Sequence, residues 1–190
     1  MKKALSNPAV AVFLALVLII ASTLISVNIK LGAKSDKVID GFYDGVKYNG
    51  YVQPSVSSQL KNIMDYAAGL VTIANNYDVS GELIDEAQNQ INALRGTMST
   101  SRDNAYFIYE RYQALIQSVD SLSYALGTQS LSERDQSGVE QYLINITGAM
   151  STIDGSGYNE SVRDFYRSYD RFPANVLGRL AGVDYPTYFE

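Results

Sequence analysis

The sequence predicts an all-α protein in which an N-terminal transmembrane helix precedes an antiparallel, up-down bundle of three long helices and a short C-terminal helix. Three observations support this fold class. Residues 4–29 carry no charge, and residues 55–172 contain no proline. Within 55–172, apolar residues recur at alternating spacings of three and four. The expected organisation is a membrane anchor at 1–30, a juxtamembrane segment at 31–54 and a helical bundle domain at 55–190.

The anchor lies between Ala9 and Val27, which bound the run AVAVFLALVLIIASTLISV. At about 1.5 Å per residue, a helix of this length nearly spans a hydrocarbon core of about 30 Å. A cleaved signal peptide is the alternative, but no small-x-small cleavage site follows the run, because Leu31 stands at the first position of the nearest approach. We therefore expect a retained, single-pass anchor in the cell membrane.

Basic residues flank the anchor on both sides. Lys2 and Lys3 precede it, and Lys30, Lys34 and Lys37 follow it, so the positive-inside rule gives nearly equal weight to the two orientations. We expect the helical domain on the extracytoplasmic side.

The segment that follows the anchor contains Gly41, Gly45 and Gly50 among aromatic residues, and we expect it to extend the anchor helix into the bundle. The first bundle helix is predicted over 56–77. Its start is marked by Pro54, and its apolar seam is Val56, Leu60, Ile63, Ala67, Leu70, Ala74 and Tyr77.

The second bundle helix is predicted over 80–126, because apolar or aromatic residues recur there at intervals of seven. The series is Ile84, Ile91, Met98, Ala105, Tyr112, Val119 and Leu126. The stretch GTMSTS at 96–101 has weak helix propensity, but the heptad phase passes through it without a slip. We therefore expect one uninterrupted helix of about 70 Å.

The third helix is predicted to begin near Glu133 and to continue to Phe172. Its first seam is Val139, Leu143, Ile146, Met150 and Ile153, and its second is Tyr158, Val162, Phe165, Tyr169 and Phe172. The step of five from Ile153 to Tyr158 is a phase slip at Gly155-Ser156-Gly157, through which we expect a weakened but continuous helix. Pro173 ends it and opens a short helix to Leu180, and 184–190 is a tail.

The last third, YNESVRDFYRSYDRFPANVLGRLAGVDYPTYFE, resembles the C-terminal signature of the LemA family. The similar features are the pair Tyr158-Asn159, the pair Phe172-Pro173 and the closing Tyr188-Phe189-Glu190. The first bundle helix departs from the family pattern, because it lacks the tryptophan, the paired arginines and the IPNLV-like stretch. The resemblance implies a four-helix antiparallel domain on a single-pass anchor, without established enzymatic activity.

Composition limits the chemistry that this chain can perform. Cysteine, histidine and tryptophan are absent, so no disulfide, thiolate nucleophile, Cys/His zinc site or imidazole base can form. From residue 31 onward there are 12 basic and 20 acidic residues, a poor match for nucleic acid. The acidic pairs Asp85-Glu86 and Asp164/Asp170 are interpreted as solvated helix faces. We expect no enzyme activity, no catalytic residue and neither a cofactor nor a metal.

Function is expected to lie in protein binding. The aromatic residues that could form an exposed partner-binding patch are Tyr158, Phe165, Tyr166, Tyr169 and Phe172, with core packing as the alternative. The sequence thus indicates a membrane-anchored, non-enzymatic scaffold or adaptor that binds a protein partner of unknown identity at the cell envelope. An extracytoplasmic ligand-sensing bundle that works through a partner is the alternative. Sustained heptads also leave homo-oligomerisation open.

Overall fold

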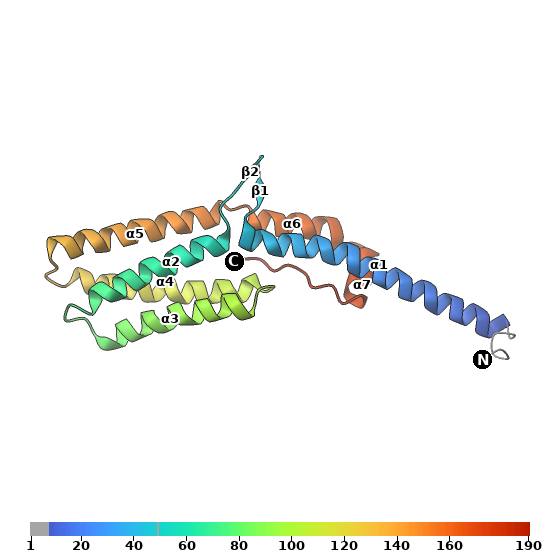
Figure 1. Cartoon of the computed structure of the whole chain (residues 1–190), viewed down its shortest axis with the longest axis horizontal. Helices are drawn as coiled ribbons and strands as arrows, with labels where there is room; N and C mark the ends of the chain where they lie inside the picture. The colour runs from blue at the N-terminus through green and yellow to red at the C-terminus, as the bar shows by residue number, and fades with distance from the viewer. Residues whose placement is uncertain (1–7, 49) are drawn as a thin grey trace.

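The computed structural model describes residues 8–48 and 50–190 and confirms the all-α class (Figure 1). Residues 1–7, which include Lys2, Lys3 and the start of the predicted anchor domain, lie outside the described residues, as does Asn49. The elements in chain order are α1 (Pro8–Asp44), β1 (Lys47–Tyr48), β2 (Tyr51–Val52), α2 (Val56–Ala74), α3 (Gly81–Thr100), α4 (Ala105–Gly127), α5 (Glu133–Asp154), α6 (Tyr158–Tyr169) and α7 (Ala174–Leu180).

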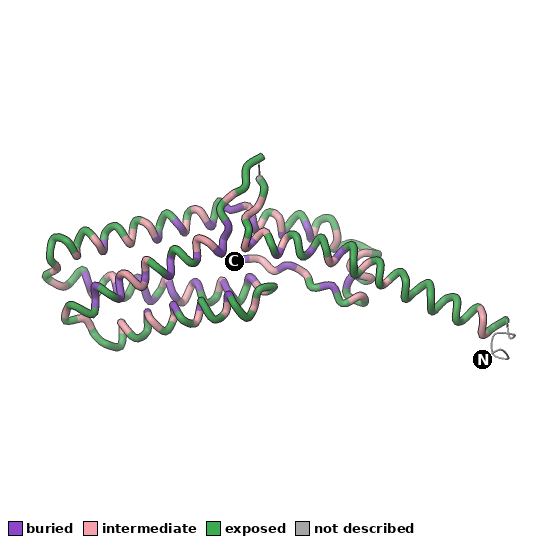
Figure 2. Tube along the Cα trace, viewed as in Figure 1, coloured by how far each residue is buried: buried purple, intermediate pink, exposed green. Residues whose placement is uncertain are grey.

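The folded part is elongated and has two ends. Helices α2 to α5 form an antiparallel four-helix bundle at one end, and the second half of α1 packs with α6 and α7 at the other (Figure 1). The buried residues of α2 to α5 converge on a common core inside this bundle, whereas the first half of α1 projects alone into solvent (Figure 2).

Helix α1 is one uninterrupted helix of 37 residues. Its apolar first half is exposed, and its second half buries Leu31, Ser35, Ile39 and Phe42, which are spaced so that they share one face. The expected extension of the anchor helix is therefore confirmed as far as Asp44, and no break separates the anchor from the segment that follows it. Among the described residues, α1 is the one helix long and apolar enough to cross a membrane.

The extension does not continue to the end of the juxtamembrane segment, because residues 45–53 form a small hairpin. Lys47 pairs with Val52 and Tyr48 with Tyr51. Gly45 and Gly50 have φ angles of +87° and +86°, which residues with a side chain rarely adopt. A Cβ at Gly45 would also collide with the carbonyl oxygen of Gln53. Gly45 therefore ends the helix, and Gly50 lies between the two strands of the hairpin.

Helix α2 agrees with the prediction for the first bundle helix, except that it ends at Ala74. The Ser55 hydroxyl caps it by accepting a hydrogen bond from the Ser58 amide at 3.1 Å. The seam from Val56 to Ala74 is buried as its spacing predicts.

The single long helix predicted over 80–126 is wrong. Residues 101–104 form a turn, and α3 and α4 pack side by side on either side of it, so the bundle has four long helices where three were expected (Figure 1). The Asn104 side chain caps α4 by accepting a hydrogen bond from the Phe107 amide at 3.2 Å. The weak helix formers before the turn, together with this cap, determine the break.

The apparent heptad continuity has a simple explanation. Met98 is the last buried seam residue of α3, and Ala105 is the first of α4. The turn happens to place them seven residues apart, and both face the same core because the chain reverses direction. The heptad repeat therefore predicted correctly which residues are buried. It was wrong in predicting that they belong to one helix.

The continuous helix expected through Gly155-Ser156-Gly157 is also wrong. Helix α5 ends at Asp154, and Gly157 has a φ of +73° immediately before α6 begins at Tyr158. The phase slip marks a change of partner, because α5 packs on α2 whereas α6 packs on α1. After α6, the short helix predicted after Pro173 is confirmed as α7.

Candidate functional site

The two ends of the molecule meet at a cluster of five aromatic side chains, which we call the aromatic junction: Phe42, Tyr109, Tyr112, Tyr158 and Phe189. The Phe42 ring on α1 lies 5.3 Å from that of Tyr158 and 5.5 Å from that of Phe189. The Phe189 ring also lies 5.2 Å from Tyr109 and 5.6 Å from Tyr112, both on α4. Phe189 therefore joins α1 and α6 to the four-helix bundle.

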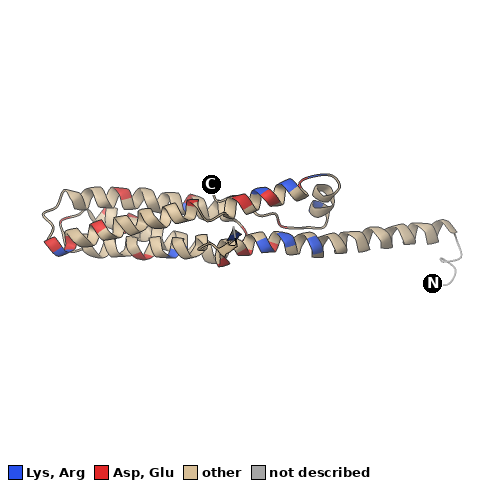
Figure 3. Cartoon of the chain, turned by 90° about the horizontal axis from the view of Figure 1, so that it is seen from above, with Lys and Arg blue, Asp and Glu red and all other residues tan. Residues whose placement is uncertain are grey.

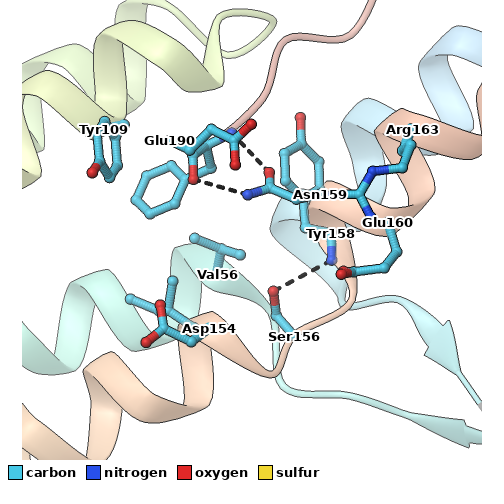
Figure 4. Close-up of a pocket in the computed structure, with 11 residues that line it drawn as sticks. Val56, Tyr109, Asp154, Ser156, Tyr158, Asn159, Glu160, Arg163 and Glu190 are labelled. Carbon is cyan, nitrogen blue, oxygen red and sulfur yellow. Dashed lines mark hydrogen bonds between the residues drawn. The ribbon is translucent and has the colours of Figure 1, made fainter. Parts of the chain in front are cut away.

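Phe189 belongs to an extended segment, residues 183–190, that we call the strap. The Asn159 side chain holds it through two hydrogen bonds: its Nδ2 donates to the Phe189 carbonyl at 3.1 Å, and its Oδ1 accepts from the Phe189 amide at 2.9 Å (Figure 4). The Tyr158 hydroxyl donates to the Thr187 carbonyl at 2.9 Å, and the Tyr166 hydroxyl donates to the Pro186 carbonyl at 3.1 Å. The segment expected to be a tail is thus a bound part of the fold.

These contacts bring together residues that carry the family-like signature. Tyr158-Asn159 and the closing Tyr188-Phe189-Glu190 are about 30 positions apart in the chain, yet they meet directly. The Asn159 side chain bonds both backbone groups of Phe189, and the rings of Tyr158 and Phe189 both contact the ring of Phe42. The signature residues therefore hold the strap in place.

A hollow of about 260 Å³ adjoins the clasp (Figure 4). Its charged lining residues are Asp154, Glu160, Arg163 and Glu190, that is, three acidic residues and one basic residue. The hollow is suited to hydrogen bonding with a polar or cationic group. Within residues 8–48 and 50–190, no group of three or more Asp, Glu, His or Cys residues is arranged to hold a metal ion.

Burial raises the pKa of two phenols of the aromatic junction, Tyr112 and Tyr158. It raises the pKa of Tyr112 to about 12 and raises that of Tyr158 above its usual value, with smaller electrostatic contributions from neighbouring groups. Both phenols therefore keep their protons at neutral pH, and the Tyr158 hydroxyl remains available as a donor to the strap.

The five aromatic residues predicted as a partner-binding patch are divided between core and surface. Tyr158 and Phe165 are buried, whereas Tyr166 and Tyr169 are half-buried. The Tyr166 ring stacks on Tyr185 and Tyr188 of the strap segment, at 6.1 and 5.9 Å. Phe172 is 83% exposed. The structure therefore does not assemble these rings into one surface, and Phe172 alone of the five is fully available to a partner.

The acidic pairs noted in the sequence lie on helix surfaces. Asp85 and Glu86 are exposed on α3, and Asp170 is exposed at the end of α6. Asp164 is exposed and lies 3.6 Å from Arg167 in an ion pair one turn away. None of these carboxylates faces another across a hollow.

Two exposed apolar surfaces were not predicted. The hairpin exposes Tyr51 and Val52, and α7 exposes Val176 and Leu180 next to Phe172. Both segments are too short to show a periodic spacing of apolar residues. The signals available in the sequence were the apolar residues next to Gly50 and those that follow Pro173. A groove of about 380 Å³ between α1 and α6 is lined by Lys34, Lys37 and Lys47 together with Asp164. Figure 3 shows the basic residues of α1 in blue, all in its second half.

A comparison with protein-family models, curated proteins and solved structures finds no match for this chain. The resemblance to the LemA family therefore stays a prediction that rests on the signature residues of the strap and α6.

Proposed function

We propose that this chain is a membrane-anchored, non-enzymatic helical scaffold that holds a four-helix bundle at a fixed position near a bilayer and binds a protein partner there. The observation that carries the proposal is α1, in which an exposed apolar half and a buried half form one helix. We place the bundle on the extracytoplasmic side.

The exposed half of α1 supports membrane anchoring through its size and composition. It exposes many large apolar side chains, which include Val12, Phe13, Leu16, Leu18, Ile19, Ile20, Ile25 and Ile29. Soluble monomers rarely expose apolar patches larger than a few hundred Å², and larger ones mark membrane or protein contacts. The 19 residues from Ala9 to Val27 rise about 28 Å as a helix, close to the thickness of a hydrocarbon core.

The buried half of α1 fixes the domain to this anchor. The Asn28 side chain donates to the Ala181 carbonyl at 2.7 Å, and the Ser35 hydroxyl donates to the Asp184 carbonyl. On the bundle side, Arg102 forms an ion pair with Asp40 at 2.9 Å and lies over the Tyr43 ring. The domain therefore follows the orientation of its anchor, which suits a scaffold.

The hairpin is the surface that we assign to the protein partner. It projects from the middle of the molecule (Figure 1), and Tyr51 and Val52 are exposed on it. Because the sheet has two strands, the outer edge of each strand has unpaired backbone groups. Such an edge with adjacent apolar side chains accepts an extended peptide segment as an added strand.

Membrane attachment is tested by alkaline carbonate extraction of the full chain and of a variant that lacks residues 9–27. We expect the full chain to stay with the membrane and the variant to be released, and extraction of both would contradict the anchor. Because the chain has no cysteine, Ser130→Cys between α4 and α5 tests orientation with an impermeant maleimide on intact cells. Labelling before lysis supports an extracytoplasmic bundle, and protection until lysis contradicts it.

Partner binding is tested with a photocrosslinking amino acid at Tyr51 in the native membrane. Tyr124, an exposed tyrosine on α4, is the matched control. We expect one specific adduct at Tyr51 that is absent at Tyr124. The same products at both positions, or none at Tyr51, would contradict the assignment of the hairpin.

A ligand-sensing bundle is a second candidate function, favoured by a hollow of about 490 Å³ between α2 and α3. Its charged lining residues are Lys61, Arg95 and Asp65, and Met64 and Met98 also line it, so an anionic ligand with an apolar portion would have two cations against one carboxylate. A thermal-shift screen of such compounds tests this function. A genuine ligand should lose its effect in Arg95→Gln, and a shift that Arg95→Gln retains would contradict this site.

A further inference from the structure

Helix α7 lies against α1 at the point where the apolar run ends (Figure 1). Gly178 is buried there, and a Cβ at this position would lie 2.7 Å from Cδ2 of Leu31. Val27, the last residue of the apolar run, packs in the same cluster as Leu31 and Ala181. Together with the hydrogen bond from Asn28 to Ala181, these contacts fix α7 beside residues 27–31 of α1.

The opposite face of α7 is apolar and exposed. Val176 is 46% exposed and Leu180 is 67% exposed, and their spacing of four puts them on one side of the helix. At 100° per residue, Gly178 lies roughly 160° to 200° from both, so this side points away from α1. Phe172, which is 83% exposed, adjoins it just before the helix begins.

Basic side chains accompany these apolar residues. Arg171 and Arg179 are exposed in the same segment, and Lys30 and Lys34 are exposed on the adjacent part of α1 (Figure 3). Asp170 and Asp184 are the exposed acidic residues closest to α7 in sequence. Exposed apolar side chains flanked by Lys and Arg are typical of helices that lie in the interface of a membrane.

We propose that α7 is a membrane-interface foot: Phe172, Val176 and Leu180 insert among the lipids of the bilayer that α1 crosses, and Arg171 and Arg179 lie at the level of the phosphates. This proposal rests on the anchor proposed above. If residues 9–27 fill the hydrocarbon core, residues 28–31 lie within about 6 Å of its edge. Residues 28–31, and α7 beside them, then lie in the headgroup layer, the region in which interfacial helices are found.

The position of α7 favours lipid as the group that covers its exposed apolar face, rather than a second copy of the chain or a partner protein. Helix α7 is held beside the end of the apolar run of α1, because Val27 packs in the same cluster as Ala181 and the Asn28 side chain donates to the Ala181 carbonyl. The foot is therefore next to lipid as soon as the anchor is inserted. It gives the domain a second attachment that resists tilting about α1.

Single-tryptophan variants of the full chain test the foot, because the native sequence has no tryptophan. The variants are Leu180→Trp and Val176→Trp in the foot, Leu18→Trp in the anchor and Tyr124→Trp in the bundle, all at exposed positions. Each is reconstituted in phosphatidylcholine and phosphatidylglycerol vesicles with or without acyl chains brominated near the headgroup or near the bilayer centre.

We expect headgroup-proximal bromine to reduce the emission of Leu180→Trp and Val176→Trp at least about twofold, whereas bromine near the centre should act most on Leu18→Trp. Tyr124→Trp should not be quenched. Quenching of Leu18→Trp without either foot variant would overturn the foot and leave the anchor intact. Quenching of none of them would overturn both. Blue-shifted but unquenched foot variants would mean that protein covers α7 and would also overturn the foot.

Discussion

Replacement of Phe189 by alanine should strongly weaken the connection between the two ends of the molecule. Phe189 is 6% exposed, and its ring contacts Phe42 on α1 together with Tyr109 and Tyr112 on α4, at 5.2 to 5.6 Å. Truncation of a buried phenylalanine costs about 3–5 kcal/mol, because the removed ring loses its burial and leaves a cavity. Because the strap backbone is held separately by Asn159, the expected loss is of this order.

The matched control is Tyr124→Ala, the truncation of an aromatic ring that is 79% exposed on α4. It should change the free energy of unfolding by less than about 0.5 kcal/mol. The assay is urea unfolding of the full chain in nanodiscs, followed by near-ultraviolet circular dichroism of the tyrosines, with amide hydrogen exchange to locate the change. Exchange in Phe189→Ala should accelerate first at residues 186–189. Equal stability of the two variants would refute the junction as the link between the ends.

Three further predictions concern the turn and the titrating groups. Asn104→Ala should cost about 1 kcal/mol in urea unfolding, because the Phe107 amide at the start of α4 loses its cap. Hydrogen bonds, the largest from Tyr77, hold the pKa of Asp135 below its usual value, so native stability should fall as pH drops below about 4. Asp135→Asn should remove this acid dependence from unfolding midpoints measured at several pH values. Burial raises the pKa of Tyr112 to about 12, so its contribution to stability is present below pH 10 and is lost as pH rises towards 12. Alkaline unfolding should therefore be shallower in Tyr112→Phe, and spectrophotometric titration checks it.

Much of the fold follows from the spacing of apolar residues, because burial on one helix face is a local property. The seam of α2 and the buried positions of α3 and α4 were predictable for this reason. The turn at 101–104 was not, because a four-residue reversal preserved the interval between Met98 and Ala105. The local signals, weak helix formers followed by an Asn cap, were the correct ones.

The strap and the aromatic junction depend on contacts that periodicity cannot report. The hydrogen bond from Tyr158 to Thr187 joins residues 29 positions apart, and the strap has no regular secondary structure. The residues on which the resemblance rests hold the strap, a role that the sequence did not indicate. The glycines at 155 and 157 were the local signal of the break before α6. The phase slip in the apolar spacing arises because α5 packs on α2 whereas α6 packs on α1.

The unbroken course of α1 gives the molecule a fixed phase between its span and its bundle. A protein that contacted both would sense any change in that phase, since each residue added to a helix turns everything beyond it by about 100°. One residue inserted in the exposed half of α1 would aim the hairpin in a new direction, whereas seven would bring it back to within about 20° of the original one. The number of residues in α1 would then determine the direction in which the bundle faces.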